Sequence, residues 1–280
     1  MFCIDRDGKN KGINNIMKKG KLILVISIGF VLLWTLLPIY CLIINSLSPI
    51  STLGSLFPQT ITFEYYTQLF RGSGTIYNVV VNSFIVSIVT VIITILIGVP
   101  GGYGVSRWTK GKYIFTGLFI LRMIPPISFL IPWFFILWKL NLLDTRIGLI
   151  IAYVRLPFTI VLMKGFFDSI PIELEEAAKI DGATFFQTFL KIIVPLSLNG
   201  VVVVALFTFI HSYFEFMYAV VLTRVNAKTF SVYIAGFSTE HGVQYQSMLA
   251  TSFIGMIPMI LLYTFFQKYI VSGLKVGLDK

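Results

Sequence analysis

The stretch IPIELEEAAKIDGATFFQTFLKIIVPL, residues 170–196, is a long run of mixed charge between two strongly apolar parts of the chain. Its acidic residues are Glu173, Glu175, Glu176 and Asp181. Pro171 suits the first turn of a helix, and glutamates near that turn complement the positive end of the helix dipole. Gly182 is expected to end or sharply bend this helix, and a second amphipathic stretch then leads to Pro195. The stretch therefore predicts a short acidic helix between two apolar segments.

The composition indicates what lies around this helix. Of the 280 residues, 56% are hydrophobic and only 12% are charged, with a mean hydropathy of +0.87. A single core in water cannot bury so much apolar surface, so the chain is expected in a membrane. The net charge is +10, but the basic residues form short clusters between apolar runs, which favours membrane lipid over nucleic acid as a partner. Cys3 and Cys41 match neither a disulfide framework nor a zinc spacing.

The apolar runs are long enough to cross a bilayer as helices, which takes about 20 residues. The predicted fold is an all-α membrane protein with these six transmembrane helices: Leu22–Ile44, Asn78–Pro100, Tyr113–Trp138, Ile147–Phe167, Leu196–Leu222 and Met248–Ile270. The predicted parts of the chain are a tail 1–21, a first span 22–44, an outer segment 45–77, a core domain 78–270 that contains a loop 168–195, and a tail 271–280. Gly98 and Gly102 share a helix face, which indicates either close packing of another helix or a simple helix exit.

The lysines and arginines outside the spans predict the orientation. They are frequent in the tail 1–21, after the second span, around residues 168–195 and near the C-terminus, and they are scarce in the other connections. Because basic residues stay on the cytoplasmic side, both termini and the segment 168–195 are expected there, in a multi-pass protein of the cell membrane. The acidic helix could lie on lipid headgroups or dock on a protein. Its glutamates disfavour the anionic leaflet, and Leu174, Ala177, Ala178 and Asp181 are expected to share a shallow docking face.

The same stretch resembles a known motif. Glu176-Ala177-Ala178, three residues, Gly182, nine residues and then Ile192-Ile193-Val194-Pro195 is similar to the Glu-Ala-Ala loop of permease subunits in bacterial and archaeal ABC importers, with Val194 replacing a leucine. The resemblance implies the type I ABC importer permease fold and a cytoplasmic coupling helix that fits a cleft on an ATPase subunit. The coupling residues it implies are Glu175, Glu176, Ala177, Ala178, Asp181 and Gly182.

The sequence has no Gly-x-x-x-x-Gly-Lys-Ser/Thr loop to hold a nucleotide phosphate and no motif of a hydrolase or metal site. A transport subunit without catalytic residues, bound metal or cofactor is therefore expected. The resemblance implies the partners: a homologous permease in a heterodimer, two ABC ATPase subunits that bind ATP and Mg, and an extracytoplasmic solute-binding protein.

Further segments resemble the carbohydrate branch of this family, in particular the shorter inner-membrane subunit of maltose-type transporters. They are Phe57–Phe70, Val81–Ser83, Gly101–Lys112, Leu140–Tyr153 and Gln267–Lys280. That branch often carries Trp-Asn-Glu-Phe in the fifth span, where this chain has Tyr213-Phe214-Glu215-Phe216 and so lacks the asparagine. The resemblance implies import of sugars or oligosaccharides driven by ATP.

Several polar side chains lie within the predicted spans, where charges are costly and face a cavity or one another. The candidate substrate-path residues are Arg122, Arg155, His211, Tyr213, Glu215 and Tyr218. The alternative is an internal Arg–Glu pair that joins two helices. Arg122 and Arg155 would also suit an anionic solute such as a sugar phosphate. An ion-coupled secondary transporter is disfavoured, because it would need several deep carboxylates and an internal repeat, and an intramembrane enzyme would need paired acids or metal ligands.

Overall fold

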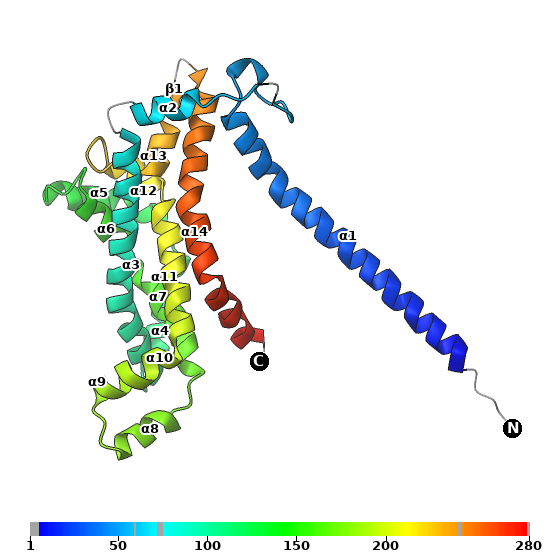
Figure 1. Cartoon of the computed structure of the whole chain (residues 1–280). Helices are drawn as coiled ribbons and strands as arrows, with labels where there is room; N and C mark the ends of the chain where they lie inside the picture. The colour runs from blue at the N-terminus through cyan, green and yellow to red at the C-terminus, as the bar shows by residue number, and fades with distance from the viewer. Residues whose placement is uncertain (1–5, 59, 72–74, 240–241, 279–280) are drawn as a thin grey trace. The chain divides into compact units, whose positions relative to one another are not determined.

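The computed structural model describes residues 6–58, 60–71, 75–239 and 242–278, and these residues are mainly helical (Figure 1). The helical elements are α1 (Arg6–Ser46), η1 (Ile50–Thr52), α2 (Glu64–Arg71), α3 (Thr75–Arg107), α4 (Gly111–Met123), η2 (Pro126–Phe129), α5 (Leu130–Lys139), α6 (Arg146–Tyr153), α7 (Leu156–Asp168), α8 (Glu173–Ile180), α9 (Phe185–Thr188), the π-helical turn η3 (Phe189–Ile193), α10 (Val194–Leu196), α11 (Leu198–Tyr213), α12 (Met217–Leu222), α13 (Phe230–Ala235) and α14 (Tyr245–Leu278). A short antiparallel hairpin pairs β1 (Ser238–Thr239) with β2 (Gly242–Val243). The predicted all-α class is confirmed; Cys3 and Lys280 lie outside the described residues.

Helices of membrane-spanning length occur in two forms. Three are long and apolar enough to span alone: Gly20–Ser46, Thr75–Arg107 and Tyr245–Lys268. Three bent pairs qualify when each pair is taken as one span: Gly111–Met123 with Pro126–Lys139, Arg146–Tyr153 with Leu156–Asp168, and Phe185–Leu196 with Leu198–Tyr213. The described residues therefore provide up to six spans. They differ from the predicted ones because the third, fourth and fifth are broken.

The breaks have local causes. The third span turns by 90° where Pro125 and Pro126, which lack backbone N–H groups, separate α4 from η2. The fourth bends by 46° before Pro157, which lies in the first turn of α7. The predicted fifth span, Leu196–Leu222, is not continuous either, because α11 ends at Tyr213 and α12 begins at Met217.

The chain divides into two compact units, residues 1–66 with 245–253 and residues 67–244 with 254–280. In the first unit, the segment after α1 folds back on the end of that helix. Thr62 donates its N–H to the Leu47 carbonyl, Gly54 donates its N–H to the Asn45 side chain, and Ser46 hydrogen-bonds Tyr66. The segment 47–66 is therefore ordered by hydrogen bonds to the C-terminal turn of α1 and its neighbours.

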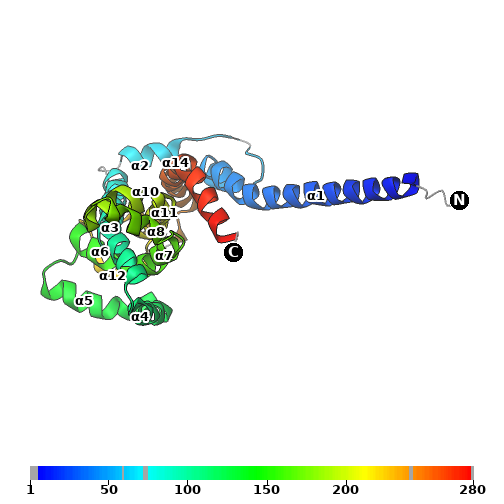
Figure 2. The same ribbon diagram turned by 90° about the horizontal axis from the view of Figure 1, so that it is seen from below.

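The second unit is organised around α3, against which α7 and α11 run side by side (Figures 1 and 2). The contact with α7 is close at two glycines. A Cβ atom on Gly98 would lie 2.4 Å from Thr159 Cγ2, and one on Gly102 would lie 2.7 Å from Met163 Cβ. Larger residues would force the two helices apart. Of the two alternatives that the sequence left open for this glycine face, close packing of another helix is the one that the structure has.

One end of the second unit is held by a carboxylate that sequence reasoning did not single out. Asp144, between α5 and α6, accepts the backbone N–H groups of four successive residues in the α12–α13 connection: Arg224, Val225, Asn226 and Ala227. Partial burial raises the pKa of this carboxyl, but these N–H groups outweigh burial and lower the pKa to about 2. Asn82 of α3 donates to the Asn226 and Lys228 carbonyls of the same connection. The connection is thus fixed to both α3 and the α5–α6 turn.

Candidate transport cavity and coupling segment

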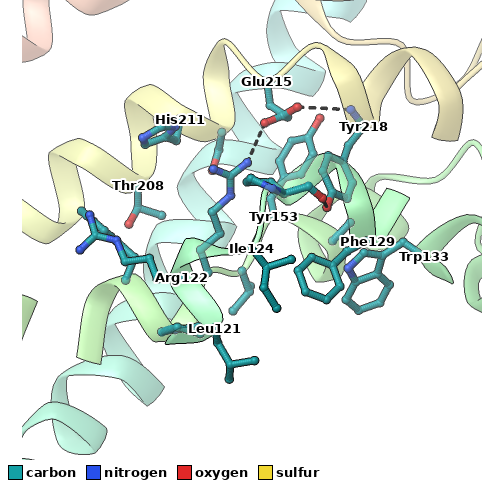
Figure 3. Close-up of a pocket in the computed structure, with 17 residues that line it drawn as sticks. Leu121, Arg122, Ile124, Phe129, Trp133, Tyr153, Thr208, His211, Glu215 and Tyr218 are labelled. Atoms are coloured by element: carbon teal, nitrogen blue, oxygen red, sulfur yellow. Dashed lines mark hydrogen bonds and ion pairs between the residues drawn. The ribbon is translucent and has the colours of Figure 1, made fainter. Parts of the chain in front are cut away.

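A cavity of about 390 Å³ opens in the second unit beside the breaks in the third, fourth and fifth spans (Figure 3). Its walls come from the end of α4, from η2 and α5, from the α6–α7 break and from α11 and α12. The volume lies in the range of small-molecule sites, about 300–1,000 Å³. The helix breaks therefore release backbone groups from helical hydrogen bonds and bring polar side chains together at the cavity.

Glu215 lies in the break between α11 and α12 and is paired. Its Oε2 atom is 2.8 Å from Arg155 Nη2, and its Oε1 atom accepts the Tyr218 backbone N–H at 3.2 Å, close to the start of α12 (Figure 3). The Glu215 side chain is 13% exposed and that of Arg155 is 35% exposed. One carboxylate therefore joins the fourth and fifth spans and also caps a helix, at the wall of the cavity.

Arg122 is the other cationic side chain at the cavity. Its guanidinium lies over the ring of Phe158, 4.8 Å from the ring centroid, where the negative face of the aromatic ring stabilises a cation. Among the described residues it has no ion pair, whereas Arg155 has Glu215. The two arginines that the sequence analysis grouped as path residues thus differ in role. The Glu215 carboxylate compensates the charge of Arg155, whereas Arg122 faces the cavity over the Phe158 ring.

Aromatic side chains form much of the remaining wall: Phe129, Trp133, Tyr153, Phe158 and Tyr218. The Tyr218 hydroxyl donates to the Pro126 carbonyl at 2.6 Å, which links α12 to η2. The Tyr153 hydroxyl is buried and has no hydrogen-bond partner among the described residues. Thr208, His211 and Ser212 add polar groups from α11. An apolar aromatic wall with a few convergent polar groups is typical of a small-molecule site.

The structure brings together five of the six candidate path residues at this cavity: Arg122, Arg155, His211, Glu215 and Tyr218. Tyr213 is an exception, which corrects the expectation from the sequence. It is fully buried and stacks between Phe209 and Phe230, with ring centroids 5.6 and 6.0 Å away. Sequence reasoning missed Phe129, Trp133 and Tyr153, because single aromatic residues in apolar spans give no signal until the helix breaks are known.

At the opposite end of α3 lies the coupling segment, residues 168–195, which contains α8 and α9 (Figure 1). The helix α8 ends in a Schellman motif: Ala183 donates its N–H to the Ala178 carbonyl, and Gly182 donates its N–H to the Lys179 carbonyl. Gly182 has a φ of +81°, which a side chain would strain. Thr184 then begins α9 with a capping box formed with Gln187. Gly182 ends the helix as the sequence predicted.

The two sides of α8 differ, and this corrects the predicted docking face. Ala178 is buried and Glu175 is turned toward α3, whereas Glu176, Ala177 and Asp181 are exposed. Ile180 is 86% exposed, although it is one of the most hydrophobic residues of this helix. Ala178 therefore does not belong to the free surface, whereas the other members of the predicted face, Leu174, Ala177 and Asp181, are exposed. Glu176 and Ile180 are exposed beside Ala177, and these three residues are called the exposed side of α8.

The fold and cavity define a class of protein: a helical membrane subunit with broken spans around a cavity that has an aromatic wall and a few polar groups, as transport of a solute requires. The sequence model of the binding-protein-dependent transport system inner membrane component matches residues 95–276. The chain belongs to this family. It is a multi-pass membrane protein and a transport subunit.

Individual relatives agree with this placement. The chain is 37% identical over 256 residues to the trehalose transport system permease protein SugB of Mycobacterium tuberculosis, covering 88% of this chain and 93% of that protein. It is 28% identical to the arabinooligosaccharides transport system permease protein AraQ of Bacillus subtilis, covering 86% and 89%. A chain of a bacterial ABC transporter that imports the acidic polysaccharide alginate has the same fold, with a TM-score of 0.75, 24% identity and coverage of 96% and 99%.

Proposed function

We propose that this chain is a membrane-spanning subunit of an ATP-driven importer for sugars or oligosaccharides. The single observation that carries the proposal is the cavity at the helix breaks, whose walls combine aromatic rings with paired and unpaired charged groups. Aromatic faces stack on the apolar side of a sugar ring, and charged or hydroxyl groups bind its hydroxyls. The saccharide relatives support the same class of solute.

The proposed complex has this chain beside a homologous permease, two ABC ATPase subunits that bind ATP and Mg, and an extracytoplasmic solute-binding protein. Both termini and the coupling segment lie in the cytoplasm of this complex, as the distribution of lysines and arginines indicates. The exposed side of α8, formed by Glu176, Ala177 and Ile180, enters the ATPase cleft. Closure of the ATPase around nucleotide then moves α8 and turns the cavity from one side of the membrane to the other.

A second candidate solute is an acidic saccharide or sugar phosphate. Arg122 lines the cavity and has no ion pair among the described residues, and its guanidinium fork matches a carboxylate or phosphate. Arg155 does not add to this argument, because Glu215 compensates its charge. Neutral and acidic saccharides are therefore compared directly in the test of function.

The test is ATP-driven uptake by the complete complex in proteoliposomes, with a panel of labelled neutral and uronic-acid oligosaccharides that begins with trehalose. We expect uptake of at least one saccharide that requires both ATP and the binding protein. Trp133→Ala, at the cavity wall, should lower that uptake several-fold, up to about tenfold, while the complex still assembles, because one aromatic contact contributes about 0.5–1.5 kcal/mol beyond the area it buries.

The matched control is Trp138→Ala, which removes the same ring from an exposed position of α5 that does not line the cavity. Its uptake should equal that of the unmodified complex. Uptake driven by an ion gradient without ATP would contradict the proposed class, and uptake lost equally in both variants would contradict the cavity as the path.

A further inference from the structure

Glu175 is held inside the protein by two side chains of α3. Arg107 Nε is 2.6 Å from Glu175 Oε1, and the Tyr103 hydroxyl donates to Oε2 at 2.6 Å. The Arg107 and Glu175 side chains are only 18% and 16% exposed. Both carboxylate oxygens are therefore engaged by groups of one neighbouring helix, and an ion pair with an added hydrogen bond at this degree of burial has a well-defined geometry.

Arg107 makes further contacts with the connection between α7 and α8. Its Nη2 atom donates to the Ile170 carbonyl at 3.0 Å, and its Nη1 atom donates to Ser106 Oγ at 3.1 Å. Ser106 in turn donates to Asp168 Oδ1 at 2.6 Å, at the last residue of α7. The C-terminal turn of α3 therefore fixes the end of α7, the connection and the first turn of α8 together.

Tyr103 extends the same contact to the far side of the coupling segment. Its ring centroid lies 5.5 Å from that of Phe167 in α7, 5.6 Å from that of Phe185 in α9 and 5.0 Å from that of Phe189 in η3. Tyr103 and Phe189 are buried. One residue of α3 thus contacts the chain before α8, α8 itself through Glu175, and the chain after α8.

We propose that Glu175 is a positioning residue, the joint through which movement of α8 reaches α3 and α7, and not a contact with the ATPase. This inference rests on the proposed docking of the exposed side of α8. α3 and α7 move as one body because they are in close contact at Gly98 and Gly102. The N-cap of α7 is Arg155, at the cavity wall. The ion pair therefore connects the docking helix to the helix that carries the Arg155–Glu215 pair.

Without the joint, α8 could pivot. The connection on one side, residues 169–172, is attached to α3 by the Arg107–Ile170 hydrogen bond and by the buried Ile170 side chain, and the connection on the other side contains Gly182 in a left-handed conformation. A push on the exposed side of α8 would then turn this helix about its ends instead of displacing α3. The joint is thus needed for transmission, whereas binding of the ATPase depends on the opposite side of α8.

The experiment uses the complete complex and a readout that needs no identified solute. Ser212 lines the cavity, and a Ser212→Cys reporter is labelled with a maleimide before and after trapping with Mg-ATP and vanadate. With Glu175 intact, trapping should change the labelling rate about fivefold or more. Glu175→Gln should retain bound ATPase and ATP hydrolysis but lose most of this change, and Tyr103→Phe should lose a smaller part.

Exchange of the two charges, Arg107→Glu with Glu175→Arg, should restore much of the change in labelling rate. The control is Glu173→Gln, the same substitution at an exposed position of α8, which should leave the change in labelling rate intact. A full response in Glu175→Gln, or failure of the exchange to restore it, would overturn the joint. Loss of the ATPase from the Glu175→Gln complex would also overturn it, because Glu175 would then contact the ATPase. Separately, Ile180→Arg should release the ATPase. Retained ATPase in that variant would contradict the proposed docking surface, whereas the Glu175 variants test the joint independently.

Discussion

At the scale of single residues, Glu215 combines the two roles that the sequence left open. Its carboxylate pairs with Arg155 and accepts the Tyr218 N–H, so it joins two spans, and it also lines the cavity. A charged pair at the rim of a cavity avoids part of the cost of burying charge in hydrocarbon, because the cavity admits water or solute. The pair therefore joins two spans and also lies at the wall of the cavity through which we propose that a saccharide passes.

We expect Glu215→Gln to destabilise the complex, because the amide leaves the Arg155 guanidinium without its counter-charge and weakens the cap of α12. The loss should be about 1–2 kcal/mol, toward the low end for a charged hydrogen bond, since Arg155 is one-third exposed. The measurement is thermal unfolding of the purified complex in detergent. A second change, Arg155→Gln, should recover part of the loss, whereas Glu173→Gln should have no effect; unchanged stability of the single mutant would show that the pair contributes nothing.

At the scale of elements, the contact between α3 and α7 depends on two missing side chains. Gly98 and Gly102 lie one turn apart, and each would place a Cβ atom inside the van der Waals radius of a side chain on α7. The pair of helices links the coupling segment at one end to the α6–α7 break at the other. In the proposed transmission, the rigidity of the α3–α7 pair determines how much of the movement of α8 reaches the cavity.

Gly98→Ala should therefore destabilise the protein by about 1–3 kcal/mol through overpacking, because its Cβ atom would lie 2.4 Å from Thr159 Cγ2. Gly104→Ala is the matched control, since a Cβ atom there would meet nothing within 4 Å. Thermal unfolding in detergent measures both. Thr159→Ser removes the clashing methyl group and should restore part of the stability of Gly98→Ala; equal stability of the two alanine variants would contradict the close contact.

Hydropathy was sufficient to predict the helical class and most of the span positions, because each span must be apolar over about 20 residues whatever its neighbours are. The glycine face and the end of α8 at Gly182 were also predictable, since each depends on a local property of glycine. The broken spans were missed, because runs such as Tyr113–Trp138 stay apolar through the bend and hydropathy alone does not mark it, although Pro125, Pro126 and Pro157 mark two of the breaks in the sequence. Tyr213 was placed at the path because the stretch 213–216 resembles Trp-Asn-Glu-Phe, but the end of α11 turns Tyr213 and Glu215 to different surroundings.

The inward side of α8 was unpredictable for a related reason. Glu175 and Glu176 are adjacent glutamates, and only the position of Tyr103 and Arg107 at the end of α3 shows that Glu175 is the one turned inward. Asp144 likewise carries no signal in the sequence, because its partners are backbone N–H groups some 80 residues away. Contacts that join distant segments through a single polar side chain require the structure.

At the scale of the whole molecule, we propose that this subunit receives movement from an ATPase through the exposed side of α8. The direct measurement is photo-cross-linking in the native complex, with a photoreactive amino acid in place of Ile180, which is 86% exposed, and in place of Ala178, which is 6% exposed. We expect a light-dependent adduct between position 180 and the ATPase subunit, and no adduct with another chain from position 178. An adduct of position 180 with the extracytoplasmic binding protein, or with no partner at all, would contradict it.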